Sequence, residues 1–160
     1  MNKRSQIIGR ILYWLSWPVL FIYLRNSKRC RAIVSEGDNI LIIRNWLGPG
    51  HYTLPGGGLR PYEDPKRGII RELEEETGLV VKADNLMLIK PQYLAIEKGH
   101  SYQCFGFYVK VDKYQQITRQ KYEIAEIKWV NKREVLEKYQ LTSTARDLIS
   151  SWLGDDLLLD

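Results

Sequence analysis

Two aliphatic-rich runs open the regular hydrophobic pattern of the chain, from Arg31 to Ser35 and from Ile40 to Arg44. They are joined by the tetrapeptide Glu36 to Asn39, which is rich in turn-forming residues. Short strand-forming runs with such a connection predict a β-hairpin. Further strands are predicted at Tyr52 to Leu54, about Leu86 to Ile96, Tyr102 to Asp112 and Ile124 to Val130.

A helix is predicted between Asp64 and Gly78. Asp64 is a suitable N-cap, and Pro65 is tolerated at the first helical position because its missing N–H has no partner there. Gly78 ends the helix, since glycine adopts the left-handed conformation without a Cβ penalty. The apolar stripe that would dock this helix on a sheet consists of Ile69, Ile70 and Leu73.

Two further helices are predicted towards the C-terminus. Asn131 is a candidate N-cap with Glu134 three residues later, an arrangement like a capping box. Thr144 to Leu153 has the spacing of an amphipathic helix. A chain of 160 residues can bury a substantial core but is short for two ordinary domains, so the interleaved strands and helices predict one α/β domain.

The polar face of the helix after Asp64 carries the candidate chemistry. Glu72, Glu75 and Glu76 follow the i, i+3, i+4 spacing and therefore share one helix face. Three carboxylates on neighbouring turns repel one another, and a bound cation would resolve that repulsion. Oxygen ligands without a nearby His or Cys cluster predict a hard ion, Mg²⁺ first and Mn²⁺ second. The alternative is a solvated acidic face on a surface helix.

This helix belongs to a longer motif, from Gly57 to Leu79, with the sequence GGLRPYEDPKRGIIRELEEETGL. Its glycines, Glu63, Arg71 and the three glutamates stand at the spacing of the Nudix box, and every fixed position of that pattern is filled. The chain therefore resembles the Nudix hydrolases, which cleave pyrophosphate linkages in nucleoside diphosphate derivatives with the help of magnesium. The resemblance covers roughly residues 31–140 and implies an α/β/α sandwich with a mixed β-sheet.

The resemblance also implies roles for individual residues. The metal ligands would be the carboxylates of Glu72, Glu75 and Glu76 and the backbone carbonyl of Gly56. Arg71 would orient Glu72, and Glu63 would brace the junction between loop and helix. The general base would be Glu72 or a carboxylate outside the motif, for which the candidates are Glu123 and Glu126.

Three positions depart from the commonest pattern of the family. Arg60 stands where an acidic residue is usual, Tyr62 replaces a frequent glycine, and Gly68 replaces a frequent alanine. Arg60 could contact a substrate phosphate or be solvated. Trp46, Tyr52 and Tyr93 could stack on a base, although aromatic residues in such positions more often belong to the core.

The N-terminal segment, residues 1–29, has a different character from the catalytic domain expected over residues 30–160. Ile7 to Leu24 is almost entirely apolar and rich in aromatic residues. Seven of the 24 basic residues and none of the 19 acidic residues precede Glu36, so the net charge of +5 originates at the N-terminus.

An interfacial helix fits this composition best, with residues 7–31 binding an anionic membrane surface. A spanning helix is less well supported, because the charge-free run Ile11 to Leu24 is shorter than the ~20 residues required and contains Pro18. The alternative is an apolar helix packed on the domain or in a homodimer interface. Nucleic acid is not expected, since the basic residues flank an apolar stretch rather than a polar groove.

Cys30 and Cys104 have no metal-ligand spacing and form no disulfide framework, which favours a reduced, cytoplasmic protein, held at the inner face of a membrane if the interfacial helix forms. The expected activity is magnesium-dependent cleavage of the pyrophosphate bond of a nucleoside diphosphate derivative. One alternative is a catalytically silent Nudix domain that senses nucleotides or mediates membrane-associated interactions. Another is removal of pyrophosphate from RNA 5′ ends, supported only by the basic N-terminus.

Overall fold

The computed structural model describes residues 28–46, 50–97, 100–112, 117–118 and 124–156 of the chain. The predicted N-terminal helix and Glu123 lie outside these residues. Within the described part, no helix is both long enough and apolar enough to cross a bilayer.

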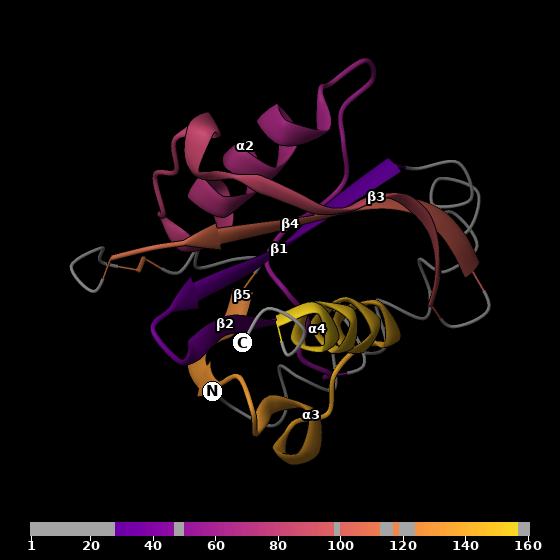
Figure 1. The fold of residues 1–160 in the computed structure, drawn as a ribbon. Helices are drawn as coiled ribbons and strands as arrows, with labels where there is room; N and C mark the ends of the chain where they lie inside the picture. Colours follow the sequence, from indigo (N-terminus) through magenta and orange to yellow (C-terminus); the bar gives the residue numbers. More distant parts are fainter. Residues whose placement is uncertain (1–27, 47–49, 98–99, 113–116, 119–123, 157–160) are drawn as a thin grey trace.

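Five strands form one mixed sheet in the order β3-β4-β1-β2-β5 (Figure 1). The β1–β4 pair is parallel, and the other three neighbouring pairs are antiparallel. The strands are β1 Lys28–Glu36, β2 Asn39–Asn45, β3 Met87–Glu97, β4 His100–Lys110 and β5 Ile124–Asn131.

The predicted hairpin is confirmed. Strands β1 and β2 pair with Ser35 opposite Ile40 and Glu36 opposite Asn39. Gly37 in the turn has a φ of 59°, a conformation that costs glycine little. This register places alternate residues of both strands in two different cores.

After the two residue pairs named above, β2 no longer pairs with β1. The chain segment that carries the glycines pairs with β1 there instead. Cys30 N–H donates to Gly57 O at 3.0 Å, and Ala32 N–H donates to Pro55 O at 3.0 Å. Strand β2 pairs instead with β5 over most of its length. The sheet is therefore split, and the glycine segment fills the split.

The strand predicted at Tyr52 to Leu54 is shorter in the structure. Only two isolated bridges form, Tyr52 with Leu141 and Thr53 with Ile43. The extended segment then runs directly into the glycines beside β1.

Helices cover both faces of the sheet, which confirms the α/β/α sandwich (Figure 1). On one face lies α2, Pro65–Thr77, followed by the short 3₁₀ turn η1, Ala83–Asn85; on the other lie α3, Val135–Lys138, and α4, Ser143–Asp156. Ile69 and Leu73 of α2 are fully buried against β1, and Leu148 and Ile149 of α4 are fully buried in the second core.

The predicted capping role of Asn131 is wrong. Asn131 is the last residue of β5, and α3 begins at Val135 after Glu134. The Asn131 Oδ1 accepts a hydrogen bond from Arg133 N–H at 3.0 Å. Asparagine side chains form such local turns readily, and this one connects β5 to α3.

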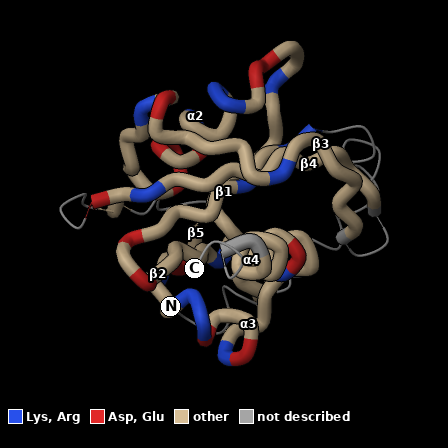
Figure 2. Tube along the Cα trace, viewed as in Figure 1, with Lys and Arg blue, Asp and Glu red and all other residues tan. Residues whose placement is uncertain are grey.

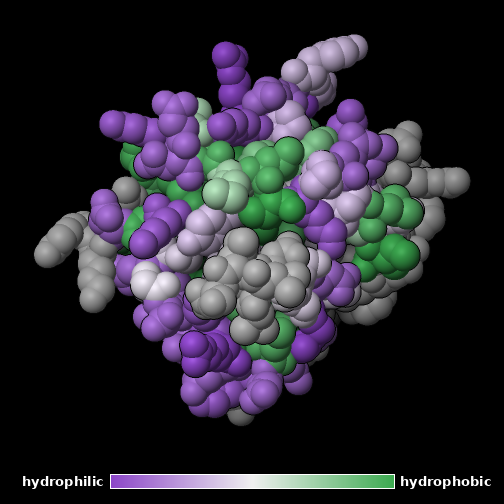
Figure 3. Space-filling model, in the orientation of Figure 1, coloured by the Kyte–Doolittle hydropathy of each residue, from purple (hydrophilic) through white to green (hydrophobic). Residues whose placement is uncertain are grey.

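The edge strand β3 exposes several large apolar side chains, and apolar surface shows along this strand in Figure 3. They are Met87, Leu88, Leu94 and Ile96.

Candidate functional site

Helix α2 is fixed at both ends as its sequence predicts. The Asp64 Oδ1 accepts hydrogen bonds from Lys66 N–H at 3.0 Å and Arg67 N–H at 3.1 Å. Gly78 has a φ of 72° and donates its N–H to Glu74 O. These caps fix where the helix begins and ends.

Arg71 is the centre of the charged cluster that α2 and the preceding loop form. Its guanidinium binds Glu63 in a fork, with Nε–Oε1 at 2.9 Å and Nη2–Oε2 at 3.0 Å. Its Nη1 donates to Glu72 Oε1 at 2.7 Å and to Glu75 Oε2 at 3.0 Å. Acidic and basic residues therefore lie together in and before α2 (Figure 2), and one arginine holds three carboxylates.

Glu63 links the loop before α2 to the helix through its hydrogen bonds. Besides the fork to Arg71, its Oε2 accepts the backbone N–H of Arg60 at 2.7 Å. The hydrogen bonds from Arg71, with further help from Arg60, lower the pKa of Glu63 from 4.5 to about 2. Glu63 is thus a permanent anion at neutral pH, and it joins the loop to the helix.

Glu72 lies against the backbone of Gly57. A Cβ atom added to Gly57 would lie 2.5 Å from the Glu72 carboxyl carbon, so only glycine leaves room for this carboxylate. Burial raises the pKa of Glu72, and the hydrogen bond from Arg71 offsets part of this increase. A carboxylate with a raised pKa is a better proton acceptor than an ordinary one.

Glu76 is 5% exposed and binds the backbone of Gly56. Gly56 N–H donates to Glu76 Oε2 at 2.7 Å. Gly56 has a φ of 130°, and a Cβ there would lie 2.3 Å from Cys30 O, so this position also requires glycine. Glu72 and Glu76 therefore both lie against the glycine segment that fills the split in the sheet.

Arg31 belongs to the site, although its position in the sequence groups it with the basic residues of the N-terminal segment. It lies within β1, is 7% exposed, and donates a hydrogen bond from its guanidinium to the Gly56 carbonyl. Its charge also acts to lower the pKa of Glu72. The available signal was an arginine inside an otherwise buried, apolar strand, because such a charge is retained only with a partner.

The donor set fits a hard divalent cation in chemical type. The carboxylates of Glu72, Glu75 and Glu76 and the carbonyl of Gly56 offer oxygen alone, as Mg²⁺ or Mn²⁺ prefers. Each of these groups is bonded to a donor of the protein. Among the described residues, no three His, Cys, Asp or Glu side chains converge in the geometry of a preformed metal site.

The NUDIX domain model matches residues 26–152, which is most of the chain. The chain belongs to the NUDIX domain family.

A relative from Methanocaldococcus jannaschii named ADP-ribose pyrophosphatase is 32% identical over 81 residues. The matched stretch covers 49% of this chain and 48% of that relative, so the chain spans about half the relative's length.

Two solved structures share the fold. The MutT protein from Methanosarcina mazei Go1 superimposes with a TM-score of 0.69 at 23% identity, covering 82% of this chain and 95% of that chain. The bifunctional NMN adenylyltransferase/ADP ribose pyrophosphatase from Francisella tularensis, complexed with AMP and a manganese ion, gives a TM-score of 0.67 at 19% identity. That match covers 91% of this chain and 46% of the other.

The structure does not bring Glu126 to the Nudix box. The two-residue alternation along β5 places Glu126 on the sheet face covered by α3 and α4, opposite α2. It is bonded there to Arg44 at 2.5 Å, Lys128 at 2.8 Å and the Tyr52 hydroxyl at 2.9 Å. Burial favours protonation of Glu126, but these three partners outweigh it and lower its pKa.

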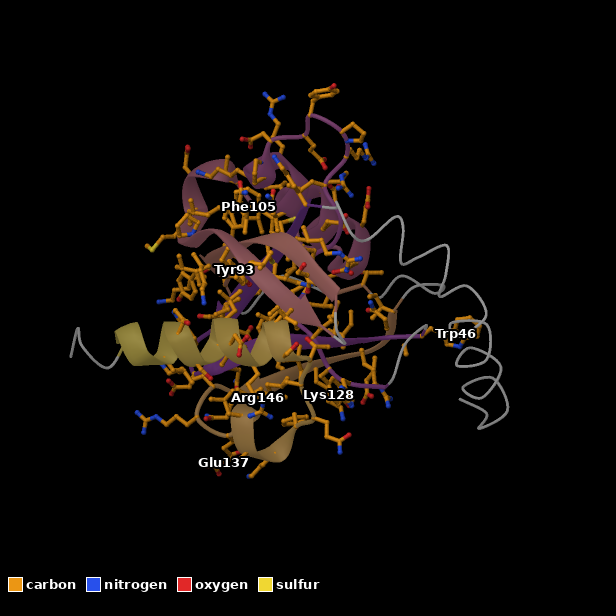
Figure 4. The ribbon with its side chains drawn as sticks, turned by 90° about the vertical axis from the view of Figure 1, so that its right-hand side faces the viewer. Trp46, Tyr93, Phe105, Lys128, Glu137 and Arg146 are labelled. Carbon is orange, nitrogen blue, oxygen red and sulfur yellow. The ribbon has the colours of Figure 1, made fainter. Side chains whose placement is uncertain are left out.

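The aromatic candidates for base stacking are dispersed. Trp46 lies at the end of β2, far from the labelled Tyr93 (Figure 4). Tyr52 packs edge-on against Tyr139 with ring centroids 5.5 Å apart, as part of the α4-side core. Burial raises the pKa of Tyr93, which packs beside a third buried cluster. His51 is exposed in the segment before the glycines.

Gly68 is explained by packing. A Cβ at this position would lie 2.2 Å from the Leu59 side chain, which covers the start of α2. The alanine that is frequent in the family would require Leu59 to move.

Proposed function

We propose that this chain is a magnesium-dependent hydrolase that cleaves the pyrophosphate bond of a nucleoside diphosphate linked to another moiety. The observation that carries the proposal is a cluster of three glutamates beside the glycine segment. Arg71 holds Glu72 and Glu75, and the Gly56 N–H holds Glu76. The archaeal relative's name, ADP-ribose pyrophosphatase, and the AMP and manganese ion in one structural neighbour support this substrate class.

The cation, Mg²⁺ with Mn²⁺ as an alternative, would be held by Glu72, Glu75, Glu76 and the Gly56 carbonyl. When bound it supplies positive charge for the diphosphate oxygens and acidifies water. The repulsion between the three glutamates gives the site its affinity for such an ion.

Glu72 is the proposed proton acceptor. Its contact with Gly57 and its hydrogen bond from Arg71 limit the positions of its carboxyl group, which suits it to take a proton from the attacking water. Arg71 orients Glu72 through the 2.7 Å hydrogen bond, and Glu63 holds Arg71 through the fork. Glu63 and Arg71 thus act as positioning residues.

The proposal is tested by hydrolysis of a panel of nucleoside diphosphate derivatives, with ADP-ribose first, by the wild type and Glu76→Gln. Cleavage that requires Mg²⁺ and is lost in the variant is the expected result. A folded wild type that binds panel members and magnesium without cleaving any of them would favour the silent interaction domain instead. Release of phosphate from triphosphorylated RNA would support the RNA alternative.

The N-terminal segment is proposed to place the enzyme at the cytoplasmic face of a membrane. The support is compositional: an apolar, aromatic stretch flanked by Lys and Arg. A homodimer formed through the same apolar residues is the alternative.

A further inference from the structure

The loop before α2 contains a tight turn over residues 60–63. Glu63 N–H donates to Arg60 O at 3.0 Å, which closes the turn, with Pro61 and Tyr62 at its two central positions. In the reverse direction, Arg60 N–H donates to Glu63 Oε2 at 2.7 Å. Because Glu63 is also bound by Arg71, the turn is fixed to the catalytic helix.

Tyr62 has a strained backbone at the tip of this turn. Its φ is 62°, and it is the only residue other than glycine with a positive φ among those described. A turn with proline at its second position and a positive φ at its third prefers glycine or asparagine there. A tyrosine in the left-handed region costs about 1–2 kcal/mol.

The side chain of Tyr62 does not compensate for this strain. Its exposed fraction is 107%, so no described residue removes the ring from water. A fully exposed aromatic ring in a strained conformation contributes nothing to the stability of the isolated fold. A ligand that contacts the ring from outside the chain would explain why the tyrosine is kept at this position.

The position of the turn identifies the chemistry of that contact. Arg60 Nη2 lies 3.5 Å from Glu75 Oε1, at the exposed edge of the carboxylate cluster. The Cα atoms of Arg60 and Tyr62 can be separated by at most ~7 Å. A guanidinium beside the carboxylate cluster and an aromatic ring a short distance further out match a phosphate and the planar base that a sugar joins to it.

We infer that Tyr62 is a binding residue for the nucleobase of the substrate, with Arg60 contacting the adjacent phosphate. The inference rests on the proposed function for the substrate class, but it concerns recognition and not the chemical step. The turn holds the backbone of Tyr62 in one place beside the carboxylate cluster, and the strain of Tyr62 is retained because glycine would remove the ring.

Binding of non-hydrolysable ligands tests this without turnover. Calorimetric titration would compare α,β-methylene ADP, which has a base, with methylenediphosphonate, which has none. Tyr62→Ala should weaken α,β-methylene ADP about 5- to 20-fold and leave methylenediphosphonate unchanged. Tyr62→Phe should bind both ligands like the wild type, whereas Arg60→Gln should weaken both.

Thermal unfolding adds a readout that separates the ring from the strain. Tyr62→Gly should lose base affinity like Tyr62→Ala, yet its Tm should rise by roughly 1–3 °C because glycine relieves the strained φ. Tyr62→Ala keeps the strain, so its Tm should not rise.

The inference is overturned if Tyr62→Ala and Tyr62→Gly bind α,β-methylene ADP as the wild type does, or weaken both ligands equally. A wild type that does not bind α,β-methylene ADP would overturn it as well. Base-dependent binding without hydrolysis would instead uphold Tyr62 and contradict the proposed hydrolase. Hydrolysis of a panel member would uphold the proposed hydrolase. If substitution of Tyr62 left the binding of α,β-methylene ADP unchanged, the role of Tyr62 would be overturned.

Discussion

Arg71 illustrates how a single side chain can organise a site that is otherwise electrostatically unfavourable. Three carboxylates lie within 3.0 Å of its guanidinium nitrogens, and each of them alone would repel the others. The planar fork of arginine fits this task because its donors diverge in fixed directions. Lysine carries the same charge but lacks the planar set of diverging donors.

Arg71→Lys should therefore lower kcat by about 10- to 100-fold while changing KM much less, because Glu72 loses its orientation but the charge remains. Steady-state kinetics on the substrate identified from the panel would measure this. Arg67→Lys, on the exposed side of the same helix, is the matched control and should behave like the wild type. A rise in KM with an unchanged kcat in Arg71→Lys would contradict the positioning role of Arg71.

Glu63 should make folding stability depend on pH in the acidic range. Its folded-state pKa is about 2, below the ordinary 4.5, so the unfolded state binds more protons between these values. The stability that Glu63 supplies is full above about pH 4.5 and is lost as the pH falls towards 2.

Urea unfolding of the wild type and Glu63→Gln at several pH values would measure this contribution. The gap in unfolding free energy should be on the order of 1–2 kcal/mol at pH 7, should narrow below about pH 4.5 and should close as the pH approaches 2. A gap that stays constant from pH 7 to pH 3 would mean that the ion pair is not its cause.

At the scale of elements, the glycine segment and α2 form one unit. Gly57 and Gly58 are neighbours with opposite surroundings. A Cβ at Gly57 would collide with the Glu72 carboxylate, whereas a Cβ at Gly58 would meet no atom of the described residues within 4 Å. This contrast provides an internal control for the proposed role of Glu72.

Gly57→Ala should lower kcat/KM by about 100-fold, since displacement of a catalytic carboxylate by about 1 Å has costs of that size. Gly58→Ala should remain close to the wild type in both activity and Tm. Equal losses in the two variants would indicate a general sensitivity of the segment instead of a specific contact with Glu72.

The elements with local signals could be predicted from the sequence. Asp64, Pro65 and Gly78 encode the ends of α2, and the hairpin of β1 and β2 follows from its turn residues. The pairing of Pro55 to Leu59 with β1 could not be predicted, because it depends on where β2 leaves β1 and not on local propensity.

The same distinction applies to the site. Glu63, Arg71 and the three glutamates lie in one motif and were identified by spacing. Arg31 is 25 residues from the Gly56 carbonyl that it binds, and no periodicity connects them. In the sequence, the only sign of strain at Tyr62 is that a tyrosine replaces a frequent glycine. The positive φ angle shows that the backbone is strained there.

At the scale of the whole molecule, the charge excess and the carboxylate cluster occupy different parts of the chain, apart from Arg31, which lies in β1 and binds Gly56. The basic residues that give the net charge of +5 precede Glu36, whereas the carboxylates of the site lie between Glu63 and Glu76. Attachment to a membrane and catalysis are therefore expected to be separable.

Flotation of the full chain with anionic phosphatidylserine liposomes should be lost in a chain that starts at Lys28, while hydrolysis persists. Trp17→Ala should weaken flotation because an interfacial aromatic residue is removed. Trp46→Ala, at the end of β2, is the matched control. Equal flotation of the full and shortened chains would rule out the membrane role of the segment.

The contacts of Arg71 have one more consequence, which concerns how the sequence around this site can diversify. Its partners Glu63, Glu72 and Glu75 lie within eight positions of it along the chain, so the cluster is specified almost entirely by one contiguous stretch. Distant strands and loops can then change through mutation without disturbing it. Substrate preference can then change at surfaces outside this stretch, and also at residues inside it that do not hold the cluster, such as Tyr62.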